Sequence, residues 1–234
     1  MKIGVLGTGV VGQTLAGKLH ELGHDVMMGS RDAEKALART LPGQPGSSSL
    51  SEWRRAHPAV RLSSFAEAAS HGTMIVNATS GAVSLDALRM AGAENLDGKV
   101  LLDVSNPLDF SHGMPPSLSL CNTDSAGEQI QRAFPRARVV KALNTVTAAL
   151  MVNPSLLGGG DHTLFICGND AGAKAEVTAL LRDGFGWRDV MDLGDIGSAR
   201  GMEMYLPIWL RMWGAIGTGI FNVRVVRTEG GARK

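Results

Sequence analysis

The sequence predicts an α/β fold, a doubly wound parallel sheet followed by a small C-terminal α+β domain. Three observations predict it: short apolar runs alternate with helical patterns, the first apolar run leads directly into a glycine-rich turn, and the rhythm changes after Leu150. Strands that alternate with helices pair in parallel, because each helix carries the chain back across the sheet. We therefore expect a first domain over residues 1–150 and a second domain over residues 151–234.

Strands and helices of the first domain follow from short apolar runs and from helical spacing. The runs typical of buried strands are Lys2–Leu6, Asp25–Met28, Val60–Leu62, Met74–Asn77, Val100–Val104 and Arg138–Leu143. Helices are expected over residues 11–22, from about Asp32, and over Phe65–Ser70, Leu85–Ala91 and Ser125–Phe134. Turn-forming residues dominate from Leu41 to Ser49, so we expect a surface loop there.

The second domain is expected to contain two strands, Thr163–Cys167 and Trp187–Asp192, and a helix at Ala171–Leu181. A helix rich in Met and Trp follows, at Ala199–Trp213, and apolar side chains surround it. Such a helix must be buried on several sides, and Pro207 should kink it. Because this domain is small, we expect a homodimer contact to cover the helix, the alternative being burial within one subunit.

Composition excludes several classes of partner. The chain has 234 residues and a formal net charge of +1, without the basic excess that nucleic-acid binding needs. The most apolar stretch, Tyr205–Phe221, is interrupted and too short for a bilayer, and the N-terminus lacks the pattern of a leader peptide, so we expect no membrane contact. Cys121 and Cys167 form neither a disulfide framework nor a metal-ligand pattern. A cytoplasmic protein without a metal site is expected.

A glycine-rich motif of the form G-x-G-x-x-G follows the first strand and opens the first helix, at Gly7-Thr8-Gly9-Val10-Val11-Gly12. Gly7 permits the tight turn, Gly9 lets the backbone approach a phosphate, and Gly12 allows the helix to pack closely on the strand. Backbone N–H groups and the positive end of the helix dipole then face one point, which suits a pyrophosphate. In this context the motif predicts a dinucleotide-binding Rossmann domain. A glycine-rich turn without a ligand is the alternative.

The end of the second strand indicates which dinucleotide is bound. Sites for NAD usually have Asp or Glu there, whereas this chain has Gly29-Ser30-Arg31. A guanidinium beside a hydroxyl suits a 2′-phosphate, so the sequence favours NADP(H), and Thr8 adds a second hydroxyl. In the alternative, Arg31 is a solvated residue and Asp32 is the acidic ligand of the ribose.

Small polar side chains follow three later strands, at Ala78-Thr79-Ser80, Ser105-Asn106-Pro107 and Asn144-Thr145-Val146-Thr147. Ligands of open α/β sheets lie outside the carboxyl ends of the strands, so these segments point to the same crevice. We therefore expect five of these residues to contact the cofactor: Ala78, Thr79, Ser80, Asn106 and Asn144. Helix capping and turn formation are the alternative roles.

No catalytic side chain is predicted. No Ser/His/Asp order, carboxylate pair or His cluster stands out, and hydride transfer between stacked rings needs none, because the cofactors carry the chemistry. Lys141, at a strand end, could protonate a carbonyl in a hydroxyacid-type dehydrogenase. The role expected instead is that of a structural lysine whose ammonium group reaches the solvent.

Several segments together resemble the F420-dependent NADP oxidoreductase family of the pyrroline-5-carboxylate reductase-like Rossmann superfamily. Besides the glycine motif and Gly29-Ser30-Arg31, they are Val140-Lys141-Ala142-Leu143-Asn144-Thr145, Cys167-Gly168-Asn169-Asp170, Asp192-Leu193-Gly194-Asp195 and Ala199-Arg200-Gly201-Met202-Glu203. The resemblance implies hydride transfer between NADPH and the deazaflavin coenzyme F420, in a cleft between the two domains. The cytosolic domains of certain membrane ferric reductases are similar too.

The resemblance also implies residue roles. Thr8, Ser30 and Arg31 would hold the 2′-phosphate. Residues on both sides of the deazaflavin ring would be Asn144, Thr145, Val146, Thr218 and Gly219. Archaeal members have a His where this chain has Asn144, and the segment from Pro42 to Ser49 is long for the family. Two alternatives therefore stay open: an NADPH-dependent reductase of another small acceptor (a carbonyl, a flavin or a ferric chelate), and a non-catalytic NADP-binding module that senses redox state.

Overall fold

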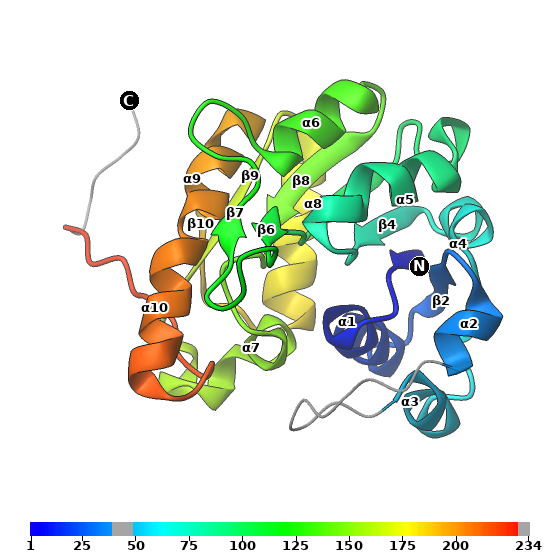
Figure 1. Ribbon diagram of the computed structural model, residues 1–234, viewed down its shortest axis with the longest axis horizontal. Coiled ribbons are helices and arrows are strands. Elements are labelled where there is room, and N and C mark those ends of the chain that lie inside the picture. Colours follow the sequence, from blue (N-terminus) through cyan, green and yellow to red (C-terminus); the bar gives the residue numbers. More distant parts are fainter. Residues whose placement is uncertain (39–48, 229–234) are drawn as a thin grey trace.

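The computed structural model describes residues 1–38 and 49–228, and its centre is a sheet with helices on both faces (Figure 1). The strands of the sheet are β1 (Lys2–Leu6), β2 (Asp25–Ser30), β3 (Arg61–Ser64), β4 (Met74–Asn77), β5 (Val100–Asp103), β8 (Arg138–Ala142), β9 (Thr163–Gly168) and β10 (Asp189–Asp192). A separate short hairpin pairs β6 (Leu108–Asp109) with β7 (Ser117–Leu118).

Strand order in the sheet is β10-β9-β8-β5-β4-β1-β2-β3. From β3 to β8 every neighbouring pair is parallel, and this part has the doubly wound order of dinucleotide-binding domains. The predicted fold class is confirmed. β9 joins β8 antiparallel and β10 joins β9 in parallel, so the strands after residue 150 extend the same sheet. The division into domains at residue 150 stays a prediction.

Two groups of helices cover the two faces of the sheet. On one face, α1 (Val10–Glu21), α3 (Leu50–Ala56), α7 (Ala148–Val152) and α8 (Ala171–Ala179) contribute to one hydrophobic core. On the other face, α4 (Phe65–His71), α5 (Ser84–Ala91), α6 (Ala126–Ala133) and α9 (Ala199–Met204) contribute to a second core. The helix α2 (Ala33–Ala38) follows β2, and α10 (Leu206–Ile216) follows α9.

The alternation of side chains along each strand produces these two cores. In β1, Ile3 and Val5 point into the core of α1, whereas the intervening Gly4 faces α4. A Cβ at Gly4 would lie 2.2 Å from the carbonyl oxygen of Ala68, so α4 rests directly on the backbone of β1. A side chain at this position would push the two layers apart.

Most elements lie where the sequence predicts them, with informative exceptions. The long helix expected at Ala199–Trp213 is broken at Tyr205 into α9 and α10, just before Pro207, which confirms the predicted kink. Ser49, expected to end a loop, is instead the N-cap of α3 and forms a capping box with Glu52. The rest of the predicted loop from Pro42 lies outside the described residues.

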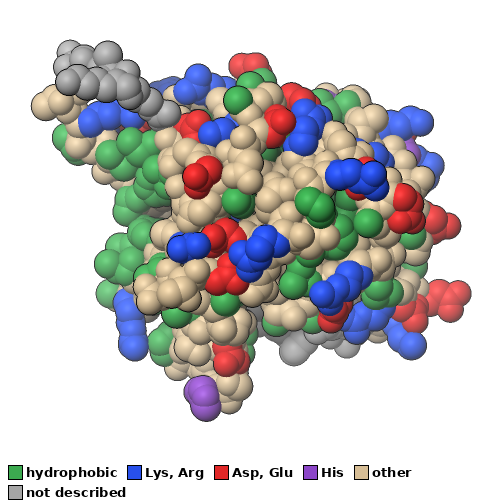
Figure 2. Space-filling model, turned by 90° about the horizontal axis from the view of Figure 1, so that it is seen from above, with side chains coloured by type: hydrophobic (Ala, Val, Ile, Leu, Met, Phe, Trp, Pro, Cys, Tyr) green, Lys and Arg blue, Asp and Glu red, His purple; other side chains and the backbone are tan. Residues whose placement is uncertain are grey.

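The helix α10 buries only one side in this chain. Leu206 and Leu210 are buried, whereas Ile208, Trp213 and Ile216 are 57%, 40% and 54% exposed. Burial on several sides, as expected for this helix, is therefore not achieved by the chain alone. Figure 2 shows apolar side chains gathered along the left edge of the molecule, the side on which α10 lies in Figure 1. In the described part of the chain, no helix is long and apolar enough to span a bilayer.

Candidate functional site

The carboxyl ends of β1, β2 and β4 border a crevice of about 530 Å³. The order in which strands are added to the sheet reverses between β1 and β4, since β2 and β3 lie on one side of this point and β5 and β8 on the other. Such switch points are where open α/β sheets bind ligands. Nine of the residues around the crevice lie at a strand end or directly after one: Gly7, Thr8, Gly9, Ser30, Arg31, Asp32, Ala78, Thr79 and Ser80.

Each glycine of the first turn is required for a different structural reason. Gly7 has φ +117°, and a Cβ there would lie 2.5 Å from the carbonyl oxygen of Ala78. A Cβ at Gly12 would lie 2.1 Å from the carbonyl oxygen of Gly7, so the first turn of α1 rests on the loop. At Gly9 no atom lies within 4 Å of such a Cβ, and Gly9 lines the crevice. The backbone therefore leaves room at Gly9 for a ligand.

The N-terminus of α1 lacks the partners that other helices of this chain have. Gly9 is its N-cap without a side-chain hydrogen bond, and its first turn, which contains Val10 and Val11, has no acidic residue. By contrast, α3 and α4 each have a Ser N-cap and a Glu that form a capping box. The open N–H groups and the helix dipole at α1 suit an anion. Gln13 Nε2 fixes the loop by donating to the carbonyl oxygen of Thr8 at 2.9 Å.

The end of β2 brings an unpartnered hydroxyl and a guanidinium to the same crevice. Ser30 is buried, and its Oγ has no hydrogen-bond partner within the described residues. Arg31 is exposed and forms no ion pair with any described residue. Asp32 is already engaged, because Lys35 donates its N–H to Oδ1 at 3.0 Å and its ammonium lies 3.1 Å from Oδ2. The Lys35 N–H and ammonium hold the pKa of Asp32 below its usual range.

The segment after β4 has a fixed conformation next to this crevice. The N–H of Ala78 donates to the carbonyl oxygen of Leu6 at 2.8 Å, which joins the loops of β4 and β1. The Thr79 hydroxyl donates to Asn77 Oδ1 at 2.7 Å and lies 2.8 Å from the Ser84 hydroxyl. The structure therefore brings Ala78, Thr79 and Ser80 to the glycine loop, as the sequence predicts.

The segments after β5 and β8 meet through Asn106 and Asn144. Asn106 Nδ2 donates to the Asn144 carbonyl oxygen at 2.8 Å, and Asn144 Nδ2 donates to Asn106 Oδ1 at 3.0 Å. The preceding residue, Leu143, has φ +65°, a conformation that costs a non-glycine residue about 1–3 kcal/mol and is concentrated at functional sites. Thr145 is buried and its hydroxyl has no partner within the described residues.

Only some of the residues assigned to the acceptor lie near one another. Val146 is buried beside Thr145. Gly219 lies against the same loop, since a Cβ there would be 3.4 Å from Thr147 Oγ1. Thr218 is exposed, and its Oγ1 accepts the N–H of Ile220 at 3.1 Å. The structure thus brings Gly219 to the loop after β8 and leaves Thr218 at the surface.

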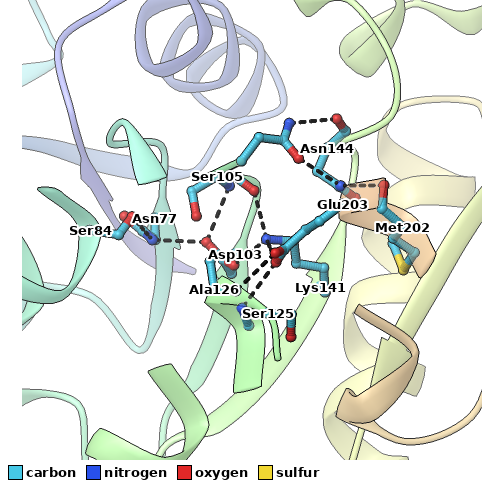
Figure 3. Close-up of polar contacts among 12 residues, drawn as sticks. Asn77, Ser84, Asp103, Ser105, Ser125, Ala126, Lys141, Asn144, Met202 and Glu203 are labelled. Atoms are coloured by element: carbon cyan, nitrogen blue, oxygen red, sulfur yellow. Dashed lines mark hydrogen bonds and ion pairs between the residues drawn. The ribbon is translucent and has the colours of Figure 1, made fainter. Parts of the chain in front are cut away.

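A buried cluster of charged residues lies behind these loops (Figure 3). Lys141 Nζ lies 2.7 Å from Asp103 Oδ2 and 2.8 Å from Glu203 Oε1, and it donates to the Ser105 carbonyl oxygen at 2.6 Å. Burial by itself lowers the pKa of Lys141, but the two carboxylates outweigh burial and raise this pKa above its usual range. Lys141 is fully buried, so the expected lysine with a solvent-exposed ammonium is wrong.

Sequence reasoning missed residues that local motifs do not reveal. Lys35 lines the crevice, and the only feature of the sequence that indicates its role is its spacing of one helical turn from Asp32. Asp103 and Glu203 are partners of Lys141, but they are far apart in the chain, and no periodicity predicts their meeting. Among the described residues, no group of three or more His, Cys, Asp or Glu side chains could hold a metal ion.

The fold and the crevice define a Rossmann-type dinucleotide-binding protein, and comparisons with known proteins show that its family consists of NADP-dependent oxidoreductases. Residues 2–107 match the family described as NADP oxidoreductase, coenzyme F420-dependent. The crystal structure of a proposed F420-dependent NADP reductase from Arthrobacter sp. FB24 superposes with a TM-score of 0.92, at 57% identity over 97% of this chain and 100% of that one. The chain belongs to the F420-dependent NADP oxidoreductase family.

Two curated relatives extend the comparison. The F420-dependent NADP reductase of Methanothermobacter marburgensis is 29% identical over 91% of this chain and 92% of its own length. The metalloreductase STEAP3 of Rattus norvegicus is 31% identical over 89% of this chain. The chain spans only 38% of the length of the rat protein. The similarity to both relatives runs through most of this chain and is not confined to the glycine motif.

Two glycine substitutions separate the packing of the motif from its use in binding. We predict that Gly9→Ala leaves the free energy of unfolding nearly unchanged, because its Cβ meets no atom, but weakens NADPH binding about tenfold by filling the approach to the backbone. Gly12→Ala should lower the free energy of unfolding by about 1–3 kcal/mol, because its Cβ collides with the Gly7 carbonyl. Urea unfolding and fluorescence titration with NADPH measure the two effects. Unchanged NADPH affinity in Gly9→Ala would place the dinucleotide elsewhere.

Proposed function

We propose that this protein transfers a hydride between NADPH and coenzyme F420 in a cleft between residues 1–150 and the C-terminal segment. The observation that carries the proposal is the crevice at β1 and β2, where the uncapped α1 N-terminus, the open space at Gly9 and the Arg31 guanidinium, which forms no ion pair with a described residue, lie together. Membership in the F420-dependent family supports the choice of acceptor.

The adenosine end of NADPH is assigned to the loops after β1 and β2. The loop from Gly7 to Gly12 offers backbone N–H groups to the pyrophosphate, and Thr8, Ser30 and Arg31 hold the 2′-phosphate. Lys35 adds a second cation at the same edge of the crevice. Since Asp32 is engaged by Lys35, it is a poor partner for a ribose hydroxyl, which supports NADP over NAD.

The reacting rings are assigned to the loops after β4, β5 and β8. NADPH, when bound, supplies the hydride, and oxidised F420 accepts it together with a proton from solvent. Thr79, Ser80 and Asn106 would bind the cofactor, Asn144 would contact both ligands, and Thr145, Val146, Thr218 and Gly219 would line the acceptor. These side chains orient the two rings and exclude water, and none of them has to gain or lose a proton.

Replacing Arg31 tests the assignment of the 2′-phosphate. We predict that Arg31→Ala weakens NADPH binding about 10- to 100-fold, because a charge-assisted hydrogen bond to a phosphate is lost. NADH binding should change little, since NADH lacks this phosphate. Fluorescence titration with each reduced dinucleotide measures both dissociation constants.

Asp32→Asn is the matched control for Arg31→Ala. It removes a charge at the neighbouring position and should leave NADH binding unchanged and NADPH binding unchanged or slightly tighter. Weaker NADH binding in Asp32→Asn would instead support Asp32 as the ligand of the ribose, and equal losses of both dinucleotides in Arg31→Ala would refute the 2′-phosphate site.

Stopped-flow mixing tests the acceptor. We predict that oxidised F420 loses its absorbance in a single phase when it is mixed with the protein and NADPH, and that the protein with NADH reacts at least about tenfold more slowly. A protein that binds NADPH and leaves F420 oxidised would disprove F420 as the acceptor.

A ferric chelate or a flavin is the second candidate acceptor. The similarity to rat metalloreductase STEAP3 favours it, because that name describes the reduction of a metal. The same NADPH assay with ferric citrate or FMN in place of F420 distinguishes the two: turnover with these acceptors and none with F420 supports the second candidate.

The exposed face of α10 is assigned to a homodimer. A groove of about 560 Å³ lies between Met114 and Pro115 on one side and α10 on the other, and Trp213 lines it. The apolar side chains of Ile208 and Ile216 are exposed on the same helix. Exposed apolar patches of this kind mark interfaces. Cys121 is an exposed free thiol, which fits a reducing compartment. We therefore assign the homodimer to the cytoplasm.

Charge substitutions on two exposed helical faces test the dimer. We predict that Trp213→Glu shifts the protein from dimer to monomer in sedimentation velocity, because it places a charge in an apolar interface. The control Met90→Glu changes a similarly exposed apolar residue on α5 and should stay dimeric. A monomeric wild type, or a Trp213→Glu dimer as tight as the wild type, would exclude this face as the interface.

A further inference from the structure

The side chains of Asp103, Lys141 and Glu203, here called the ion cluster, join three segments that are distant in the sequence. Asp103 ends β5, Lys141 lies in β8 and Glu203 lies in α9. All three side chains are at most 1% exposed. The ammonium group has three contacts, with Asp103 at 2.7 Å, Glu203 at 2.8 Å and the Ser105 carbonyl oxygen at 2.6 Å, so its donors are all used.

A fourth segment balances the charge of the ion cluster. Two carboxylates against one ammonium leave one negative charge, and the N-terminus of α6 faces it. Ala126 donates its N–H to Glu203 Oε2 at 2.8 Å, and Gly127 donates its N–H to Glu203 Oε1 at 3.1 Å. The helix dipole of α6 favours a carboxylate at this place. Glu203 is therefore held from two sides, by β8 and by α6.

Stability alone is a weak reason for such a cluster. Removing charged groups from water costs about as much as their mutual attraction returns, and apolar side chains of similar volume often stabilise a core equally well. What an apolar set cannot do is fix the direction of each contact, because dispersion is not directional. The ion cluster therefore contributes mainly by fixing the positions of the groups that it contacts.

The contacts of the ion cluster reach the loops that border the proposed ring site (Figure 3). Asp103 Oδ1 accepts from Asn77 Nδ2 at 2.8 Å and from the Ser105 N–H at 3.2 Å, and Asn77 in turn accepts from Thr79. The loops after β4 and β5 are thus fixed to Asp103.

On the other side of the ion cluster, α9 reaches the loop after β8. Asn144 Nδ2 donates to the Met202 carbonyl oxygen at 3.2 Å, next to Glu203 in the chain. Asn144 Nδ2 also donates to Asn106 Oδ1. Because both partners of Nδ2 are acceptors, they determine the orientation of the Asn144 amide group. None of these contacts involves Thr8, Ser30 or Arg31, where the 2′-phosphate is assigned.

We propose that Lys141 and Glu203 are positioning residues for hydride transfer, which hold Thr79, Asn106 and Asn144 in the arrangement that receives the two rings. This inference rests on the proposed NADPH-dependent function. It separates two roles at one crevice: the loops after β1 and β2 hold the adenosine end, and the ion cluster aligns the reacting end. A small displacement of the rings slows transfer strongly, whereas the affinity for the adenosine end is kept.

Glu203→Gln is the primary test, because it keeps the shape of the side chain and removes its charge. We expect the single-turnover rate of hydride transfer from NADPH to fall about tenfold or more, and the dissociation constant of NADPH to change less than about threefold. Lys141→Met is the second variant, and we expect it too to slow hydride transfer while leaving the dissociation constant of NADPH nearly unchanged. If Lys141→Met does not fold, Glu203→Gln alone decides.

Arg200→Gln is the matched control for a merely structural role. Arg200 also joins α9 to α6, through a bidentate ion pair with Glu128 at 2.6 and 2.8 Å, but no hydrogen bond or ion pair among the described residues joins it to β8 or to the loops after β4, β5 and β8. Its loss should lower the melting temperature while leaving the transfer rate within about twofold of the wild type. A transfer rate in Glu203→Gln that matches the rate in Arg200→Gln would overturn the proposal.

Hydrogen exchange supplies a readout that does not depend on the acceptor. Glu203→Gln should speed exchange in peptides that cover residues 104–107 and 143–147, whereas Arg200→Gln should speed it only in α6 and α9. If the wild type binds NADPH but reduces no F420, the proposed acceptor fails, and the positioning role is then decided by this exchange and by transfer to FMN. Unchanged exchange in both loops would overturn the positioning role whatever the acceptor.

Discussion

The convergence of parallel strands on one edge of the sheet is the constraint on which the rest of the structure depends. The strands β1, β2, β4, β5 and β8 all end at this edge, and the order in which strands are added to the sheet reverses between β1 and β4. Five loops from distant parts of the sequence therefore meet without any long-range motif that brings them together. The close approach of α4 to β1 at Gly4, and of α1 to the first loop at Gly12, keeps this edge compact.

Charge is handled in two opposite ways along that edge. At the end of β2 the charges of Arg31 and Lys35 are exposed, and the Ser30 hydroxyl has no partner in the described part of the chain. At the ends of β5 and β8 the charges of the ion cluster are buried and fully engaged. An exposed charge is free to bind a ligand, whereas a buried and satisfied charge fixes the protein itself. The two parts of this sheet edge are thus suited to different tasks.

Local patterns could predict much of the fold and one end of the site. Gly7 and Gly9 belong to one turn, and Ser30 and Arg31 lie at the end of one strand, so the sequence places these four residues at one crevice. The contact of Gly12 with Gly7 is also local, whereas the contact of Gly7 with Ala78 is not. The break before Pro207 is also local. The antiparallel addition of β9, the capping of α3 by Ser49, and the meeting of Lys141 with Glu203 were not predicted. The first and the last of these depend on tertiary contacts, which leave no period or spacing in a single sequence. The capping of α3 is local, because Ser49 and Glu52 have the spacing of a capping box, but the turn-forming residues before Ser49 favoured a loop.

Calorimetric titration of the wild-type protein with NADP⁺ and with NAD⁺ tests the central claim most directly, namely that the crevice is built for an additional phosphate on the adenosine ribose. The two ligands differ only in that group, so the difference in binding free energy reports on the contacts at Thr8, Ser30, Arg31 and Lys35. The account predicts that NADP⁺ binds at least about tenfold more tightly than NAD⁺, an advantage that shrinks as salt is added. Equal affinity for the two dinucleotides, or no binding of either, would contradict it.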